Sequence, residues 1–115
     1  MTKDLLFLLP PGFAANDRRE FCPECAEMWG VLSYYPALKE ALEIEYVGID
    51  HPRDAICELL GAGRWNAPTL ILRDAKPRPD DLPVQSSNGF EFLGSARDIA
   101  KYFALRFGTA MPRGS

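Results

Sequence analysis

The first apolar run of the chain covers Leu5 to Leu9 and is followed at once by turn residues over 10–12. A short apolar run that stops at turn residues is typical of a strand buried on both faces of a sheet. Residues 44–49, 70–72 and 90–92 are also rich in residues that favour β-structure. The pattern therefore predicts four short strands.

Apolar residues recur every three or four positions after Pro23, which predicts a helix beginning there. Pro36 cannot continue this helix, because its ring blocks a backbone hydrogen bond and disfavours helical geometry at Tyr35. We therefore expect a break near Tyr34 and Tyr35, followed by a further helical piece over 37–42.

Two more helices are predicted from spacing and from their ends. Residues 53–60 carry an apolar side and stop at Gly61. The last helix begins after Ser95, where Asp98 is placed to complete a capping box, and it ends at Gly108.

The predicted element order is β-α-β-α-β-β-α. Helical crossovers favour parallel pairing of the first three strands, and the link after the third strand favours an antiparallel pair. We expect a single α/β domain over 1–115, with one mixed four-stranded sheet and helices on both faces. Residues 13–21 and 74–88 are expected to be loops, and the tail from about 109 to 115 to be loose.

Composition narrows the class of protein. A chain of 115 residues is the usual length of one domain, and its net charge of −3 argues against nucleic acid as a partner. The apolar run at 5–9 is shorter than the roughly 7–15 residues of a secretory core, and no stretch approaches the roughly 20 that a membrane span needs. Three cysteines are too few for a secreted disulfide scaffold. We therefore expect a cytoplasmic protein with no membrane partner.

Cys22-Pro23-Glu24-Cys25 is the candidate site, at the start of the first helix. Proline suits the first helical position, so Cys22 falls at the N-cap and Cys25 at the third helical position. Unpaired backbone N–H groups and the helix dipole favour a thiolate there, and thiolate is the nucleophilic form. The pattern predicts thiol–disulfide exchange, in which Cys22 attacks and Cys25 resolves the mixed disulfide.

Three stretches of the chain together resemble the thioredoxin-like superfamily, in particular its glutaredoxin and glutathione-transferase N-domain branch. The cysteine motif resembles the glutaredoxin Cys-Pro-x-Cys. Ala67-Pro68-Thr69 resembles the cis-proline segment, and Gly94-Ser95-Ala96-Arg97 is similar to the turn that holds the γ-glutamyl end of glutathione. The resemblance covers most of residues 4–108. The chain also resembles a small bacterial family of thioredoxin-like proteins.

The resemblance implies a thioredoxin-like fold and a glutaredoxin-like thiol–disulfide oxidoreductase. Such a protein requires no cofactor, can use glutathione as a co-substrate, and acts on a disulfide-containing small molecule or a protein thiol. A cis Pro68 would bring the Ala67 backbone beside Cys22, as part of the catalytic site. The residues implied in substrate binding are Pro23, Ala67, Thr69 and Ser95. Glu24 replaces the aromatic residue usual in glutaredoxins, and its charge is expected to raise the thiol pKa.

Two other functions are compatible with the sequence. One is a metal site, because four nitrogen or sulfur donors match the number that a structural zinc ion takes. The four donors are Cys22, Cys25, His51 and Cys57. The cysteines could instead hold an iron–sulfur cluster that bridges two chains through Cys22. A non-catalytic binding module is the other alternative, with an exposed helix face around Trp29 and Tyr35 serving a partner or a second copy in a homodimer.

Overall fold

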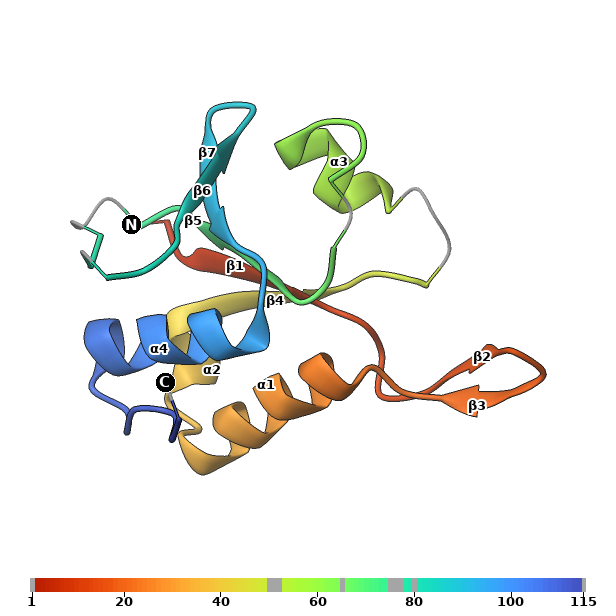
Figure 1. Ribbon diagram of the computed structural model, residues 1–115, viewed down its shortest axis with the longest axis horizontal. Coiled ribbons are helices and arrows are strands. Elements are labelled where there is room, and N and C mark those ends of the chain that lie inside the picture. The colour runs from red at the N-terminus through yellow and green to blue at the C-terminus, as the bar shows by residue number, and fades with distance from the viewer. Residues whose placement is uncertain (1, 50–52, 65, 75–77, 80, 115) are drawn as a thin grey trace.

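The computed structural model describes residues 2–49, 53–64, 66–74, 78, 79 and 81–114. Within them the central strand is β1 (Asp4–Leu8), with β4 (Leu42–Tyr46) parallel on one side and β5 (Thr69–Leu72) antiparallel on the other. The sheet continues through β7 (Phe90–Leu93) to β6 (Gln85–Ser87), both in antiparallel pairs. The described residues therefore form a mixed sheet of five strands in the order β4-β1-β5-β7-β6 (Figure 1).

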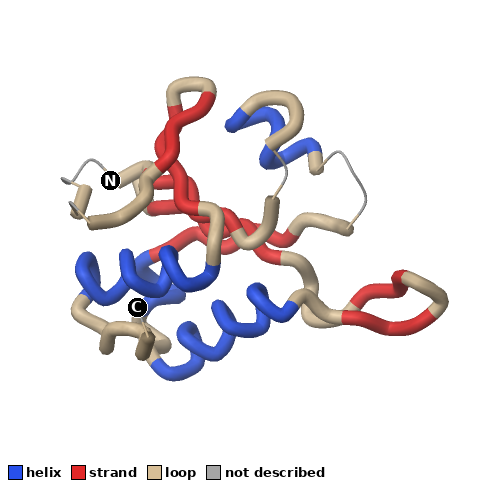
Figure 2. Tube along the Cα trace, viewed as in Figure 1, coloured by secondary structure: helices blue, strands red, loops and turns tan. Residues whose placement is uncertain are grey.

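Helices cover both faces of this sheet, as the sequence predicts. Figure 1 shows α1 (Pro23–Tyr34) and α4 (Ala96–Phe107) on one side of the sheet and α3 (Asp54–Leu60) on the other. The short α2 (Leu38–Ala41) follows the predicted break after α1 and leads into β4 (Figure 1). Figure 2 shows the helices on either side of the strands. The mixed α/β class is confirmed. None of the helices among the described residues has the length and apolar character needed to cross a membrane.

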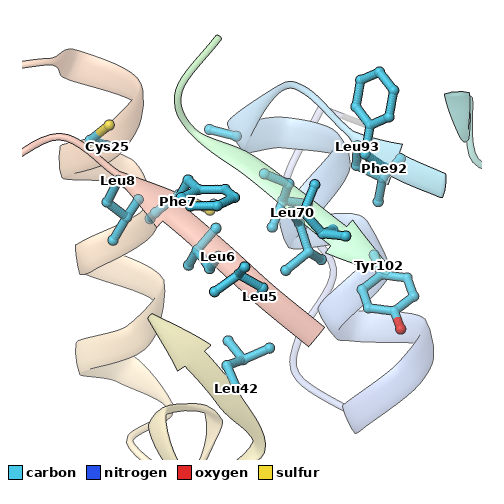
Figure 3. Packing of buried hydrophobic residues seen from close by; sticks show 14 of the residues in the cluster. Leu5, Leu6, Phe7, Leu8, Cys25, Leu42, Leu70, Phe92, Leu93 and Tyr102 are labelled. Carbon is cyan, nitrogen blue, oxygen red and sulfur yellow. The ribbon is translucent and has the colours of Figure 1, made fainter. Parts of the chain in front are cut away.

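The hydrophobic core is built around β1. Leu6, Phe7 and Leu8 are fully buried and Leu5 is 6% exposed, which confirms the prediction of a strand covered on both faces. Figure 3 shows these side chains between those of the neighbouring strands and Tyr102 of α4. A strand whose side chains are buried on both faces is typical of the interior of a sheet that is covered on both faces, and β1 lies between β4 and β5.

Asp4 is the one buried residue of β1 that the apolar pattern does not include, at 2% exposure. Its Oδ1 accepts hydrogen bonds from the backbone N–H groups of Arg73 (2.7 Å) and Asp74 (2.9 Å). Its Oδ2 accepts one from the Tyr102 hydroxyl at 2.7 Å. A buried carboxylate needs such partners, and these tie the start of β1 to the end of β5 and to α4.

The prediction of four strands is wrong, because β6 lies inside the expected loop over 74–88. Its residues Gln85, Ser86 and Ser87 are polar and carry no β-forming signal of their own. The pairing is explained by the turn at Asn88 and Gly89, which have positive φ angles of 51° and 81°. Such a two-residue turn has the twist that joins neighbouring antiparallel strands, so it places β6 on β7.

The predicted parallel pairing of the third strand is also wrong, since β5 runs antiparallel to β1. A strand of five residues spans about 17 Å, and the 12 residues of α1 return the chain over about 18 Å. The seven residues of α3 span only about 10 Å. The chain therefore re-enters the sheet at the end where β1 finishes, and Thr69 pairs with Phe7.

Residues 13–21, also expected as a loop, contain a hairpin of β2 (Phe13–Ala15) and β3 (Arg18–Glu20). Its turn is formed by Asn16 and Asp17, with φ angles of 53° and 58°. Figure 1 shows the hairpin projecting from the rest of the molecule, directly before α1.

The predicted helix ends are confirmed. The Ser95 hydroxyl accepts the Asp98 N–H at 3.2 Å and pairs with the Asp98 carboxylate at 2.9 Å. Gly61 and Gly108 follow α3 and α4 with positive φ angles of 97° and 80°. The C-terminal tail lies against the helices, because Ala110 donates to the Tyr35 hydroxyl oxygen (3.4 Å) and Arg97 donates to the Arg113 carbonyl (3.0 Å).

Candidate functional site

The two cysteines of the motif lie at the start of α1 as the sequence predicts. Cys22 is the N-cap, Pro23 is the first helical residue, and Cys25 is the third. The Cys22 Sγ accepts the backbone N–H of Cys25 at 3.2 Å. The sulfur therefore takes the place of a capping oxygen, as the acceptor for one of the N–H groups that lack partners within the helix.

The two sulfurs lie in different environments. Cys22 is half-buried, Cys25 is only 3% exposed, and both are free thiols. Burial raises the pKa of the Cys25 thiol to about 12, while the Leu9 N–H, which donates to its Sγ at 3.4 Å, acts in the opposite direction. The neighbouring Cys22 and, to a smaller extent, Glu24 add to the rise in this pKa. At neutral pH Cys25 is therefore a buried, protonated thiol, whereas Cys22 is partly exposed.

Glu24 has a structural partner that its sequence position does not reveal. Its Oε1 accepts the backbone N–H of Ala96 at 3.0 Å. Ala96 is the first residue of α4, where backbone N–H groups lack partners within the helix. One carboxylate therefore connects the start of α1 to the start of α4.

Pro68 follows a cis peptide bond from Ala67, as the resemblance implied. Asn66 holds this segment: its Nδ2 donates to the Pro68 carbonyl at 3.1 Å and to the Gly94 carbonyl at 2.7 Å. Gly94 lies just before α4, whose first residue is bonded to Glu24. Hydrogen bonds therefore connect the cysteine motif to the start of α4, and the start of α4 to the cis-proline segment.

The remaining predicted substrate-binding residues have different surroundings. Pro23 is exposed and Ala67 is half-buried. Thr69 is 1% exposed, and its hydroxyl donates to the Asn66 carbonyl at 2.6 Å, so its side chain braces the segment. The Ser95 hydroxyl is engaged as the cap of α4.

The predicted zinc ligands do not gather in the described part of the chain. His51 lies outside the described residues. The Cys57 Sγ, on α3, donates to the Arg64 carbonyl oxygen at 3.6 Å. Among the described residues no three His, Cys, Asp or Glu side chains are close enough together to hold a metal ion.

The aromatic residues considered for a partner surface are largely engaged within the chain. Trp29 is half-buried and stacks on Tyr46 of β4, with ring centroids 6.2 Å apart. The Tyr35 hydroxyl receives the tail at Ala110. Tyr34 is 82% exposed at the end of α1 far from the cysteines.

A cavity of about 250 Å³ adjoins both cysteines. We call it the Cys22 cavity. The residues around it, besides Cys22 and Cys25, are Leu9, Pro10, Pro11, Phe21, Ala26 and Trp29. The sequence pattern does not predict this cavity, because its walls come from the end of β1, the exit of the hairpin and one side of α1.

Asn66 and the role of Glu24 are the parts of the site that the sequence analysis does not identify. Asn66 has a local signal, since asparagine favours turns and Pro68 follows two positions later. Glu24 has none, because Ala96 is 72 residues away along the chain.

The fold and the site define a mixed α/β protein with a free Cys-x-x-Cys pair at a helix N-terminus and a cis proline directly before β5. The chain belongs to the family described as protein of unknown function (DUF3088), whose model matches residues 3–111. Neither the curated proteins nor the solved structures contain a match to this chain.

Proposed function

We propose that the protein catalyses thiol–disulfide exchange through Cys22 and Cys25. The observation that carries this proposal is the asymmetry of the pair. Cys22 is accessible and accepts an N–H hydrogen bond, whereas Cys25 is buried and its pKa is raised to about 12. Exchange needs one sulfur that attacks as a thiolate and a second that stays protonated until the mixed disulfide exists.

The Cys22 thiolate attacks one sulfur of the substrate disulfide. A sulfur–sulfur bond forms between Cys22 and that half of the substrate, and the other half leaves as a thiolate. Cys25 then gives its proton to solvent and attacks the Cys22 sulfur, so the first half leaves as a thiolate too. The substrate gains two electrons, and the protein ends with a Cys22–Cys25 disulfide.

The same steps in reverse reduce the Cys22–Cys25 disulfide and oxidise thiols of the cell, which restores the reduced protein. A reducing compartment such as the cytoplasm keeps such a pair reduced, so we assign the reaction to that compartment as part of the proposal. Glutathione is a less suitable partner here than in the glutaredoxins. The Ala96 N–H, in the turn that the resemblance relates to the γ-glutamyl end, is already bonded to Glu24.

We propose also that the sheet is a thioredoxin-like sheet with β6 added at one edge. Four features support this: the parallel pair β1–β4, the antiparallel strands β5 and β7, helices on both faces, and a cis proline directly before β5.

The experiment equilibrates the reduced protein in a series of glutathione redox buffers and counts the free thiols by alkylation and mass spectrometry. Cys57→Ser is the matched control, because it removes the cysteine outside the motif. The wild type and Cys57→Ser should lose two thiols together and recover them on reduction. Cys22→Ser and Cys25→Ser should not form this disulfide.

A wild-type protein that keeps all its thiols in the most oxidising buffer contradicts the proposal. So does a disulfide that persists in Cys22→Ser. Metal analysis of the same preparation provides a separate check, since one equivalent of zinc or iron that disappears in Cys22→Ser would favour a metal site instead.

A further inference from the structure

The Cys22 cavity adjoins both cysteines of the proposed redox pair and is otherwise lined by apolar residues. These residues are leucine, proline, phenylalanine, alanine and tryptophan. Binding in a cavity with apolar walls is favourable for an apolar group, because both the group and the walls are then removed from water. A group that enters therefore lies beside the proposed redox pair.

The size of the cavity limits the occupant to part of a ligand. Sites for whole small molecules measure roughly 300–1,000 Å³. The Cys22 cavity, at about 250 Å³, is smaller. It is suited to one bulky substituent of a larger substrate.

Apolar surface continues outward from the cavity on two sides. Phe21, at the exit of the hairpin, is 61% exposed. On the other side, the Trp29 ring stacks on the ring of Tyr46, which is 47% exposed. A small thiol that filled the cavity would leave these rings in water, whereas a polypeptide that continues past the cavity would cover them.

Charge near the site selects against acidic substrates. Glu24 is exposed between the two cysteines, and the chain has a net charge of −3. A carboxylate on the substrate beside the reacting disulfide would be repelled.

We propose that the Cys22 cavity binds a large apolar side chain adjacent to the reacting cysteine of a polypeptide disulfide. The inference rests on the proposed exchange function and adds its substrate class. Phe21 and Ala26 are then specificity residues, since both line the cavity. Phe21 directly precedes the cysteine motif, and Ala26 directly follows it.

The test compares symmetric disulfides of short peptides that differ only in the residue next to cysteine: phenylalanine, leucine, glycine or glutamate. Reduced wild-type protein is mixed with each peptide, and the second-order rate constant is measured by quenched alkylation. Hydroxyethyl disulfide serves as a small reference substrate. The phenylalanine and leucine peptides should react roughly 10- to 100-fold faster than the glycine peptide, as expected when one such side chain is buried. The glutamate peptide should be the slowest.

Two variants change the cavity in opposite ways. Phe21→Ala removes a wall, and Ala26→Leu fills the space with a residue that still favours helix. In each variant the ratio of the phenylalanine rate to the glycine rate should fall towards one. Tyr34→Ala is the matched control, an exposed aromatic at the other end of α1, and it should keep the wild-type ratio.

The outcomes separate the two proposals. Equal rates for all peptides, with hydroxyethyl disulfide also reduced, overturn the cavity assignment and leave exchange intact. A preference that survives in both Phe21→Ala and Ala26→Leu also overturns it. No reaction with any of these disulfides overturns the exchange function, and the substrate assignment with it.

Discussion

Replacing Cys25 with alanine should reduce the loss of stability between pH 8 and pH 10 by about 1 kcal/mol relative to the wild type. Burial raises the pKa of this thiol from its ordinary 9.0 to about 12. Between these values the unfolded chain releases the proton and the folded protein keeps it. The stabilisation is therefore fully present below pH 9 and is lost as the pH rises towards 12.

The magnitude follows from the part of this window that the experiment covers. At pH 10 the thiol of the unfolded chain is one unit above its pKa, and each unit corresponds to about 1.36 kcal/mol. The folded thiol is still protonated there, so its own ionisation adds nothing to the difference. At pH 8 neither state is appreciably ionised, so this stabilising contribution is still intact.

The assay is urea unfolding in the presence of a reductant, at pH 8 and pH 10, for the wild type and Cys25→Ala. Groups that titrate in both proteins cancel when the two changes are subtracted. Cys57→Ala keeps the buried thiol and should retain the wild-type difference. If Cys25→Ala loses as much stability between the two pH values as the wild type, the thiol is not held protonated, and its role as the resolving cysteine loses its basis.

Three further predictions concern contacts that support the site and the fold. Glu24→Ala should destabilise the protein by about 1 kcal/mol, measured by urea unfolding, because the Ala96 N–H loses its acceptor at the start of α4. Tyr102→Phe should cost about 1–3 kcal/mol in the same assay, because the buried Asp4 carboxylate loses its hydroxyl donor. Gly108→Ala should cost about 1–2 kcal/mol and lower the melting temperature, because the residue has a φ of 80°.

Each of these has a matched control. Glu27→Ala removes the next acidic residue of α1, whose contact with Arg97 is an exposed pair at 3.9 Å, and should change stability little. Tyr46→Phe alters an exposed ring, and Gly48→Ala a glycine with open space around its Cα. A control as destabilising as its partner would show that the contact named is not the cause.

The sequence by itself determined the elements that depend on local chemistry. The apolar run at Leu5–Leu9 requires burial on both faces, the proline after Cys22 suits a helix start, and Gly61 and Gly108 accept the positive φ angles that end helices. These are effects of a few neighbouring residues, and they predicted where the cysteines would lie on α1.

Only the tertiary structure decided the rest. The direction of β5 depends on how far α3 can carry the chain, and β6 exists only because β7 pairs with its polar residues. The buried state of Cys25, the contact of Glu24 with Ala96 and the Cys22 cavity all join residues from separate elements. The apolar periodicity shows which side of a helix is buried, but it does not show which distant residues that side contacts.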